Sequence, residues 1–302
     1  MFNKIKRYIK DPYSALGDDL IFKHPEFMTD KFYLSTLWRM TMGYKLDWTK
    51  PRTFNEKLQW LKLYNRNPLY TALVDKYRVK QWVADKIGWE YIIPTLEVYK
   101  SVDDINPDKL PDQFVLKCNH DSGSVVICRD KSTFDLESAK KKLAARLRHN
   151  FYMDVREWPY KNVKRCIIAE PYLEDTLSHD QPDYKFFAFD GKVKALYIAT
   201  ERNNAEAETC FDFFDMFFNH IDVTNGHPNA ISLPEKPKHF NEMIRIAEIL
   251  SQGIPHVRCD LYEIDGRVYF GEMTFYHMGG IVKFDPATYD ELLGGWISLP
   301  KR

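Results

Sequence analysis

Two Asp-Gly dipeptides, each between two runs of strand-forming residues, constrain the fold of this chain most strongly. An Asp-Gly pair in that setting predicts a tight turn between antiparallel strands, because both residues tolerate the positive φ that such a turn needs. A third pair of apolar runs flanks a polar loop. The predicted strand pairs are 114–118 with 124–128, 185–189 with 192–200, and 257–263 with 267–274. Hairpins mixed with scattered helical patterns predict an α+β fold and argue against a doubly wound parallel sheet.

Local signals predict the remaining elements. Thr53 begins a helix, because Glu56 three residues later completes a capping box. The segment 73–87 is predicted to be one helix that ends at Gly88. Other predicted elements are helices at 31–41, 138–149 and 240–250, strands at 92–99 and 166–170, and irregular chain at 201–237.

Composition narrows the class of protein. The chain has 302 residues, a length that predicts two domains or one domain with distinct lobes. Its 43 basic and 43 acidic residues cancel, so no nucleic-acid partner is expected and any anion site must be local. Five widely spaced cysteines without a Cys-x-x-Cys motif predict reduced thiols in a cytoplasmic protein.

The first ten residues bear on membrane contact. No stretch of the chain reaches the roughly 20 apolar residues of a membrane span, and this terminus lacks the apolar core of a signal peptide. Basic and apolar side chains alternate in it: Lys4, Lys6, Arg7 and Lys10 with Phe2, Ile5, Tyr8 and Ile9. We interpret the pattern as a helix exposed to solvent, and peripheral contact with the anionic inner face of the membrane is the alternative.

The loop after the strand 114–118 carries a possible phosphate site. Lys117 lies near the end of the apolar run, and Ser122, Gly123 and Ser124 follow in a small polar loop. Such a loop lets backbone N–H groups approach phosphates while the lysine supplies a fixed positive charge. An ordinary hairpin loop is the alternative interpretation.

The last hairpin carries two acidic residues, Asp260 and Glu272. A two-residue turn at 265–266 would put them on opposite faces of the hairpin. A three-residue loop at 264–266, with Gly266 in the left-handed conformation, would put them on one face. We expect the three-residue loop, since two adjacent carboxylates suit Mg²⁺. A solvated hairpin with incidental acids remains the alternative.

Taken in order, these segments resemble an ATP-grasp enzyme of the carboxylate–amine ligase type, and most closely the TupA-like branch, named for a teichuronopeptide biosynthesis protein. The motifs that carry the resemblance are 51–62 (PRTFNEKLQWLK), 67–70 (NPLY), 74–77 (VDKY), 116–120 (LKCNH), 168–173 (IAEPYL), 183–187 (DYKFF) and 258–262 (RCDLY). The resemblance implies two α+β lobes that grip ATP. It implies an N-terminal helical extension at 1–73 and an ATP-grasp domain at 74–302, with a lid lobe at about 110–165 and a catalytic lobe at about 166–290.

The resemblance also implies roles for individual residues. Arg258 and Lys185 would act on the transferred phosphoryl group, and Lys80 is expected to be only a surface charge. The implied nucleotide-binding residues are Lys76, Lys117, Ser122, Gly123 and Ser124 for the phosphates, Glu170, Tyr172 and Leu173 for adenine, and Glu174 or Asp175 for ribose. The implied Mg²⁺ ligands are Asp260, Glu272 and Thr274.

Two departures from the family pattern stand out. Thr274 replaces the usual asparagine two residues after the second acidic ligand, and Tyr276-His277-Met278-Gly279-Gly280 replaces a Pro-Gly element. The second segment is expected to shape the acceptor site. His120 and His277 are interpreted as polar surface residues in loops, and a position near the site is the alternative.

The function implied is ATP- and Mg²⁺-dependent amide formation in surface polysaccharide biosynthesis, through an acyl phosphate. The expected partners are a sugar or uronic carboxylate and a small amine or amino acid. Three alternatives remain: a glycosyltransferase, although the sequence has no Asp-x-Asp motif, a phosphotransferase on the same scaffold, and a binding module without catalysis.

Overall fold

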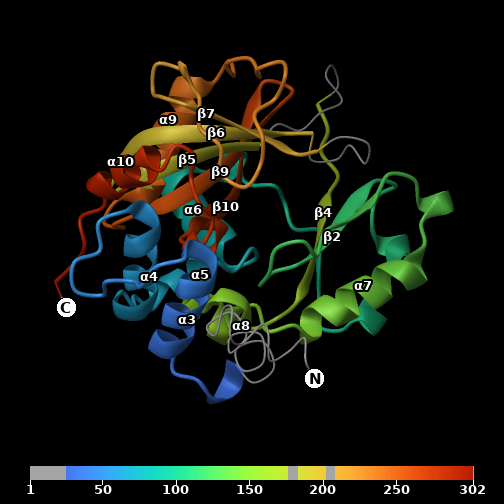
Figure 1. Ribbon diagram of the computed structural model, residues 1–302. Coiled ribbons are helices and arrows are strands. Elements are labelled where there is room, and N and C mark those ends of the chain that lie inside the picture. Colours follow the sequence, from blue (N-terminus) through green and yellow to red (C-terminus); the bar gives the residue numbers. More distant parts are fainter. Residues whose placement is uncertain (1–24, 176–182, 202–207, 302) are drawn as a thin grey trace.

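The computed structural model describes residues 25–175, 183–201 and 208–301, which form two antiparallel sheets with helices around them (Figure 1). One sheet has six strands and the other four. All pairings between strands of these sheets are antiparallel. The α+β expectation is therefore confirmed, and a doubly wound parallel sheet is excluded. The basic segment at residues 2–10 lies outside the described residues.

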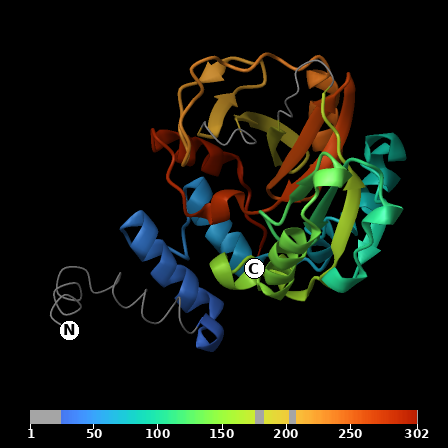
Figure 2. The same cartoon turned by 90° about the vertical axis from the view of Figure 1, so that its right-hand side faces the viewer.

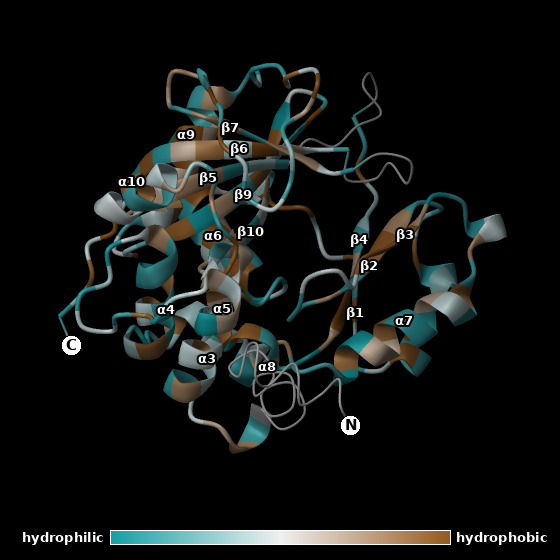
Figure 3. Ribbon diagram, in the orientation of Figure 1, coloured by the Kyte–Doolittle hydropathy of each residue, from teal (hydrophilic) through white to brown (hydrophobic). Residues whose placement is uncertain are grey.

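The six-stranded sheet has the order β10-β9-β5-β6-β7-β8. Its strands are β5 (Asp183–Phe189), β6 (Lys192–Thr200), β7 (Cys210–Phe214), β8 (His220–Ile221), β9 (Val257–Ile264) and β10 (Arg267–Thr274). Helix α9 (Phe240–Ser251) packs on one face, where the rings of Phe186 and Phe240 lie 6.1 Å apart. On the other face, Phe187 packs 5.8 Å from Phe54 of α4 (Phe54–Tyr64), and α4 in turn contacts α10 (Thr288–Trp296). Figure 3 shows the apolar character of these strands.

The four-stranded sheet, which we call the lid sheet, stands beside the six-stranded sheet (Figures 1 and 2). Its order is β1-β4-β2-β3, with β1 (Glu97–Tyr99), β4 (Ile167–Pro171), β2 (Phe114–Cys118) and β3 (Val126–Cys128). Helix α7 (Leu136–Arg148) covers the face that carries Phe114 and Leu116. Because strand side chains alternate, Lys117 points away from α7.

Smaller elements connect the sheets. The α-helices are α3 (Asp30–Met42), α5 (Leu69–Leu73), α6 (Val79–Ile87) and α8 (Tyr152–Val155). The 3₁₀ helices are η2 (Pro25–Phe27), η3 (Trp89–Tyr91), η4 (Val102–Asp104), η5 (Pro107–Lys109), η6 (Lys131–Thr133), η7 (Trp158–Asn162) and η8 (His277–Gly280). The predicted capping box is confirmed, since Thr53 and Glu56 each accept the other's backbone N–H. No helix in the three described ranges is long and apolar enough to cross a bilayer.

The predicted helix at 73–87 is wrong, because the chain forms two helices separated at residues 74–78. The side chain of Asp75 accepts hydrogen bonds from the backbone N–H groups of Tyr77 and Arg78. A short acidic side chain that bonds nearby N–H groups offers the backbone an alternative to the helix. Because the helix is broken here, the side chain of Lys76 contacts both the loop after β2 and strand β10.

Other predicted boundaries also change. Of the strand predicted at 92–99, only β1 forms, and η3 with Pro94 occupies the preceding chain. The segment at 201–237, expected to be irregular, contributes β7 and β8 to the sheet. The aromatic residues of β7 alternate with Asp212 and pair with β6, so this run of rings belongs to a strand.

Candidate functional site

Three neighbouring strands place charged side chains on one face of the six-stranded sheet. Lys185 of β5 pairs with Asp260 of β9, and Asp260 pairs with Glu272 of β10. Arg258 pairs with Thr274 in the same register. Residues directly opposite each other in antiparallel strands share a face. Helix α9 covers the other face, so these five side chains lie together on the face away from α9.

The route by which Asp260 and Glu272 reach one face differs from the expected three-residue loop. The turn has two residues, since Ile264 pairs with Arg267, and both Asp265 and Gly266 have positive φ. A bulge between Phe270 and Glu272 then shifts the register by one residue. A β-bulge inserts one extra residue and so reverses which face the following residues occupy. The prediction of one face was right, and the predicted turn was wrong.

Gly271 is the residue that permits this bulge. A Cβ atom at this position would lie 2.8 Å from a ring carbon of Tyr262 and 3.0 Å from the carbonyl oxygen of Asp260. Contacts this close to a backbone atom and a ring require a shift of the strand. The sequence alone does not reveal the role of this glycine, because the close contact is with Tyr262, nine residues earlier on the neighbouring strand.

Arg258 is the centre of the charged face. Its Nε and Nη2 donate to the two carboxylate oxygens of Asp260 at 2.7 and 2.6 Å. Nη2 also donates to Thr274 Oγ1 at 3.0 Å and lies 3.7 Å from a carboxylate oxygen of Glu272. One nitrogen therefore contacts all three residues expected to hold Mg²⁺.

This convergence tests whether the three residues suit a metal. Two carboxylates and a hydroxyl that surround one cationic point form a set of hard oxygen donors, the kind that Mg²⁺ prefers. Within the described ranges no cluster of three or more His, Cys, Asp or Glu side chains could hold a metal. A metal here would therefore depend on the two carboxylates together with Thr274, water or a phosphate.

The side chain of Lys185 lies between two buried carboxylates. Its Nζ is 2.5 Å from carboxylate oxygens of both Asp183 and Asp260. Burial raises the pKa of Asp260, although the charges of Arg258 and Lys185 oppose that effect. For Glu272, burial also raises the pKa, but Lys76, Lys185 and Arg258 together outweigh it and lower the pKa. Asp183 was missed from the sequence, although it shares a strand face with Lys185.

Lys76 joins the lid loop to the six-stranded sheet. Its Nζ donates to Glu272 of β10 at 2.8 Å and to the carbonyl oxygen of Asp121 at 3.0 Å. Its backbone N–H donates to the carbonyl of Asn119, and the Asn119 amide donates to Asp75 at 2.9 Å. Residues 74–77 and 116–120, two of the motifs that carry the family resemblance, are therefore in direct contact.

Lys117 and Glu170 form a second cluster on the lid sheet. The two carboxylate oxygens of Glu170 bind Lys117 and Lys80, each at 2.6 Å. Lys80 also donates to Ile93 O and Thr95 Oγ1 and is 9% exposed, so its interpretation as a surface charge was wrong. Burial alone would raise the pKa of Glu170, but the two lysines lower it.

The expected phosphate loop is held by α7. Arg146 bonds the carboxylate of Asp121 at 2.6 Å and the carbonyl oxygen of Ser122. Ser124 is buried, and its hydroxyl oxygen accepts the backbone N–H of Cys118 at 2.9 Å. Ser122 and Gly123 are exposed, with Gly123 at a φ of 86°. The exposed pair is therefore the part of the loop available to a ligand.

The expected adenine and ribose residues occupy the chain that leaves β4. The Tyr172 hydroxyl accepts from Arg129 at 3.2 Å, and the Asp175 carboxylate accepts the backbone N–H of Asp265 at 3.0 Å. Leu173 and Glu174 are half-buried beside them. These residues do not contact the charged face through any hydrogen bond or ion pair found in the described part of the chain.

Sequence reasoning missed the role of His277. It is buried, and its Nδ1 accepts a hydrogen bond from Arg258 at 2.8 Å while Nε2 bonds Asn225 at 2.8 Å. Burial, followed by the charge of Arg258, holds its pKa well below the usual range. The interpretation as a polar surface residue was wrong for His277, and also for His120, which is buried. The departure from the family pattern at 276–280 was the signal that marked this position.

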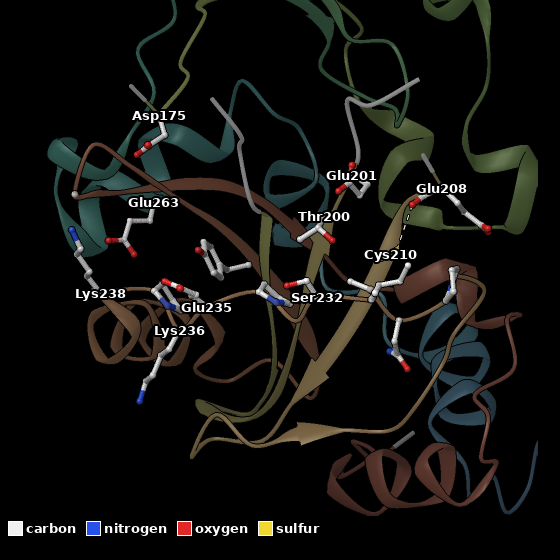
Figure 4. A pocket seen from close by; sticks show the side chains of 18 of the residues that line it. Asp175, Thr200, Glu201, Glu208, Cys210, Ser232, Glu235, Lys236, Lys238 and Glu263 are labelled. Atoms are coloured by element: carbon white, nitrogen blue, oxygen red, sulfur yellow. Dashed lines mark hydrogen bonds between the residues drawn. The ribbon is translucent and has the colours of Figure 1, made fainter. Parts of the chain in front are cut away.

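A large cavity lies elsewhere. It has a volume of about 1380 Å³, and its walls include Asp175, Glu263, Thr200 and Cys210 (Figure 4). The strand residues among these alternate with the site residues, so they lie on the opposite face of the six-stranded sheet. We therefore locate the chemistry from the charged cluster and not from the size of this cavity.

A comparison with known protein families finds one whose model matches more than half of the chain. The family model described as TupA-like ATPgrasp matches residues 56–298. Among solved structures, the chain is similar to D-alanine–D-alanine ligase from Bacillus anthracis, at 20% identity over 68% of this chain and 57% of that chain, with a TM-score of 0.36. It is similar to ATP-grasp ligase PsnB complexed with minimal precursor, Mg and ADP, at 11% identity over 87% and 66% of the two chains, with a TM-score of 0.38.

A third similar structure is L-amino acid ligase from Bacillus licheniformis, at 14% identity over 85% of this chain and 56% of that chain, with a TM-score of 0.44. The chain thus spans less than two thirds of the length of each of these three ligases. Among curated proteins, none matches the chain.

Proposed function

The chain belongs to the TupA-like ATP-grasp family, whose model covers residues 56–298, and from this premise we propose that it is an ATP-dependent, ADP-forming ligase that joins a carboxylate to an amine. The observation that carries the proposal is the convergence of Arg258, Asp260, Glu272 and Thr274 around one point. Such a cluster suits the transfer of a phosphoryl group, where negative charge must be neutralised.

ATP would bind between the lid sheet and the six-stranded sheet. Lys117 on the lid and Lys76 between the lobes supply positive charge for the phosphates, and Ser122 and Gly123 supply exposed backbone N–H groups. Glu170, Tyr172 and Leu173 would border adenine, and Glu174 or Asp175 the ribose. Ser124 supports this loop from below by accepting the Cys118 N–H.

The substrate carboxylate would attack the γ-phosphate and form an acyl phosphate, with Arg258 and Lys185 stabilising the transferred group. Asp260 accepts two hydrogen bonds from Arg258, so Arg258 would exchange part of that contact for phosphate oxygens. Asp260, Glu272 and Thr274 would hold Mg²⁺, which when bound supplies charge neutralisation at the phosphates. An amine would then displace phosphate from the acyl phosphate and form the amide.

We further propose that the acid is sugar-linked, such as a uronic acid, and that the amine is small or an amino acid. The support is the family itself, whose name derives from a polysaccharide pathway, together with residues 276–280, which depart from the family pattern beside Arg258. We place the reaction in the cytoplasm, where the basic segment at residues 2–10 would contact the inner face of the membrane.

The test is incubation of the full chain with Mg²⁺, ATP, candidate uronic sugar nucleotides or lipid-linked glycans, and amines, followed by phosphorus NMR. Formation of ADP and phosphate that depends on both the acid and the amine is the expected result. Formation of a phosphorylated sugar would favour the alternative function, a phosphotransferase. AMP, or a new glycosidic bond without ATP consumption, would overturn the ligase proposal.

A further inference from the structure

Glu157 is a buried carboxylate beside the charged face that the reaction described above does not use. It precedes η7 and is 6% exposed. Within residues 25–175, 183–201 and 208–301, its carboxylate accepts no hydrogen bond and forms no ion pair. A buried acid is normally paired. A buried carboxylate without a partner in this position can accept hydrogen bonds from a donor group of a substrate.

The position of Glu157 follows from one lysine. The Nζ of Lys62 on α4 donates to Val155 O at 2.8 Å and to Gly279 O at 2.6 Å, and so ties the end of α8 to η8. Glu157 lies two residues after Val155. His277, which binds Arg258, lies two residues before Gly279. The short segments that carry Glu157 and the Arg258 partner are therefore fastened together.

Charges from several elements act on this carboxylate. Burial raises the pKa of Glu157 to about 7, against the lowering charges of Lys62 and Arg258. Glu272 of β10 and Asp154 of α8 add to the increase. The nearby tyrosines respond in turn, since the pKa values of Tyr160 and Tyr276 are raised by burial and then by Glu157. Glu157 is thus in electrostatic range of both Arg258 and Glu272.

Lys62 does not neutralise Glu157 directly. Its ammonium group has three acceptors, Val155 O, Gly279 O and Gln59 Oε1, and these use its three N–H bonds. The negative charge of Glu157 is therefore available to a second cation. The Lys62 ammonium group lies 5.6 Å from the centre of the Tyr276 ring, and Tyr276 belongs to the segment that departs from the family pattern.

We propose that Glu157 binds the amine substrate as its ammonium ion and acts as the general base that removes its proton. This inference rests on the ligase function proposed above. The N–H bond to the transferred proton breaks, and Glu157 becomes a neutral carboxylic acid. The nitrogen lone pair then forms the C–N bond, and the C–O bond to phosphate breaks with its electron pair leaving on phosphate. The nitrogen, which is positively charged after the attack, then loses a second proton to the departing phosphate, and this gives the neutral amide.

Hydroxylamine separates this role from a structural one. It is already uncharged at neutral pH, so it attacks an acyl phosphate without a base and gives a hydroxamate. The experiment uses the full chain, ATP, Mg²⁺ and the acid and amine that support ADP release in the assay above. Glu157→Gln should lower amide formation by about 10²- to 10⁴-fold, the usual contribution of a general base. Hydroxamate formation should be unchanged.

A pH profile gives a second readout. Wild-type amide formation should level off above about pH 7, where Glu157 is ionised. The Glu157→Gln rate should continue to rise with pH as more free amine is present. Asp154→Asn is the matched control, because it removes one acidic charge three residues away, where Asp154 pairs with His149 at the surface. Above pH 7 it should leave both products unchanged, and because the charge of Asp154 raises the pKa of Glu157, its loss should only lower the pH at which amide formation levels off.

The outcomes separate the two proposals. A wild-type protein that makes neither amide nor hydroxamate with any acid overturns the ligase function, and this inference with it. A wild-type protein that makes both, alongside a Glu157→Gln variant that keeps full amide formation, overturns the inference alone. Loss of hydroxamate as well as amide in Glu157→Gln also overturns it, because Glu157 would then support the site and not the proton transfer.

Discussion

The lid sheet and the six-stranded sheet both carry buried charges, but they balance them differently. On the lid, the single carboxylate of Glu170 is shared by Lys117 and Lys80. On the six-stranded sheet and its contact to Lys76, three cations meet three carboxylates: Arg258, Lys185 and Lys76 with Asp183, Asp260 and Glu272. The lid cluster has a surplus positive charge, while the other cluster is neutral.

The difference indicates how each region would meet a nucleotide. The lid can accept a phosphate without giving up an ion pair, because its lysines outnumber its acid. The six-stranded sheet must rearrange, since every cation there already has an acidic partner. We therefore expect substitutions on the lid to act mainly on binding, and those on the six-stranded sheet to act mainly on turnover.

The largest effect is expected for Arg258→Ala. It should lower ADP formation by about 10³-fold, because the guanidinium contact to the transferred group strengthens in the transition state. The dissociation constant of ATP, measured by calorimetry, should change far less. Equal losses in binding and turnover would show that the six-stranded sheet acts like the lid and would remove the contrast between them.

Next in size is the effect of Glu170→Gln on stability. Removing one partner of a buried ion pair costs about 3–5 kcal/mol, and here it leaves Lys80 buried without a carboxylate. The folded pKa of Glu170 lies below its ordinary value of 4.5, so its contribution is present above that pH and is lost as pH falls through the folded pKa. The difference in urea unfolding between variant and wild type should therefore be largest near neutral pH and shrink in acid. A difference that grows in acid would contradict the charge sharing.

A smaller effect is expected for Lys117→Ala, which should weaken ATP binding by about 10- to 100-fold, because a charge-assisted hydrogen bond is worth about 1.5–3 kcal/mol. Calorimetry with ATP and Mg²⁺ measures it. Lys141→Ala is the matched control, since Lys141 is exposed on α7 in the same lobe. An unchanged dissociation constant for Lys117→Ala would remove the proposed phosphate contact.

Much of this architecture was predictable from local signals. The Asp-Gly turn at 190–191, the capping box at Thr53 and the apolar period at 240–250 each depend on residues close in sequence, and each was predicted correctly. The shared face of Asp260 and Glu272 was predicted from the hairpin, the roles of Arg258 and Lys185 came from the family resemblance, and these side chains do lie together. What failed depends on distant neighbours: the helix break at Asp75 is stabilised by Asn119, and the burial of Lys80 depends on Glu170.

The bulge at Gly271 is the sharpest case of such dependence, and it gives the smallest of the expected effects. An alanine there must displace the Tyr262 ring or the Asp260 carbonyl, at a cost of about 1–3 kcal/mol for overpacking. Gly295→Ala is the control: a Cβ there meets nothing within 4 Å, so it should be neutral or slightly stabilising. Urea unfolding gives both values.

Because Gly271 sets the register that brings Glu272 opposite Asp260, Gly271→Ala should also lower ADP formation while leaving the lid, and hence ATP binding, close to wild type. An alanine variant with wild-type stability and turnover would mean that the bulge forms without the glycine, and that strand pairing alone places the two carboxylates together.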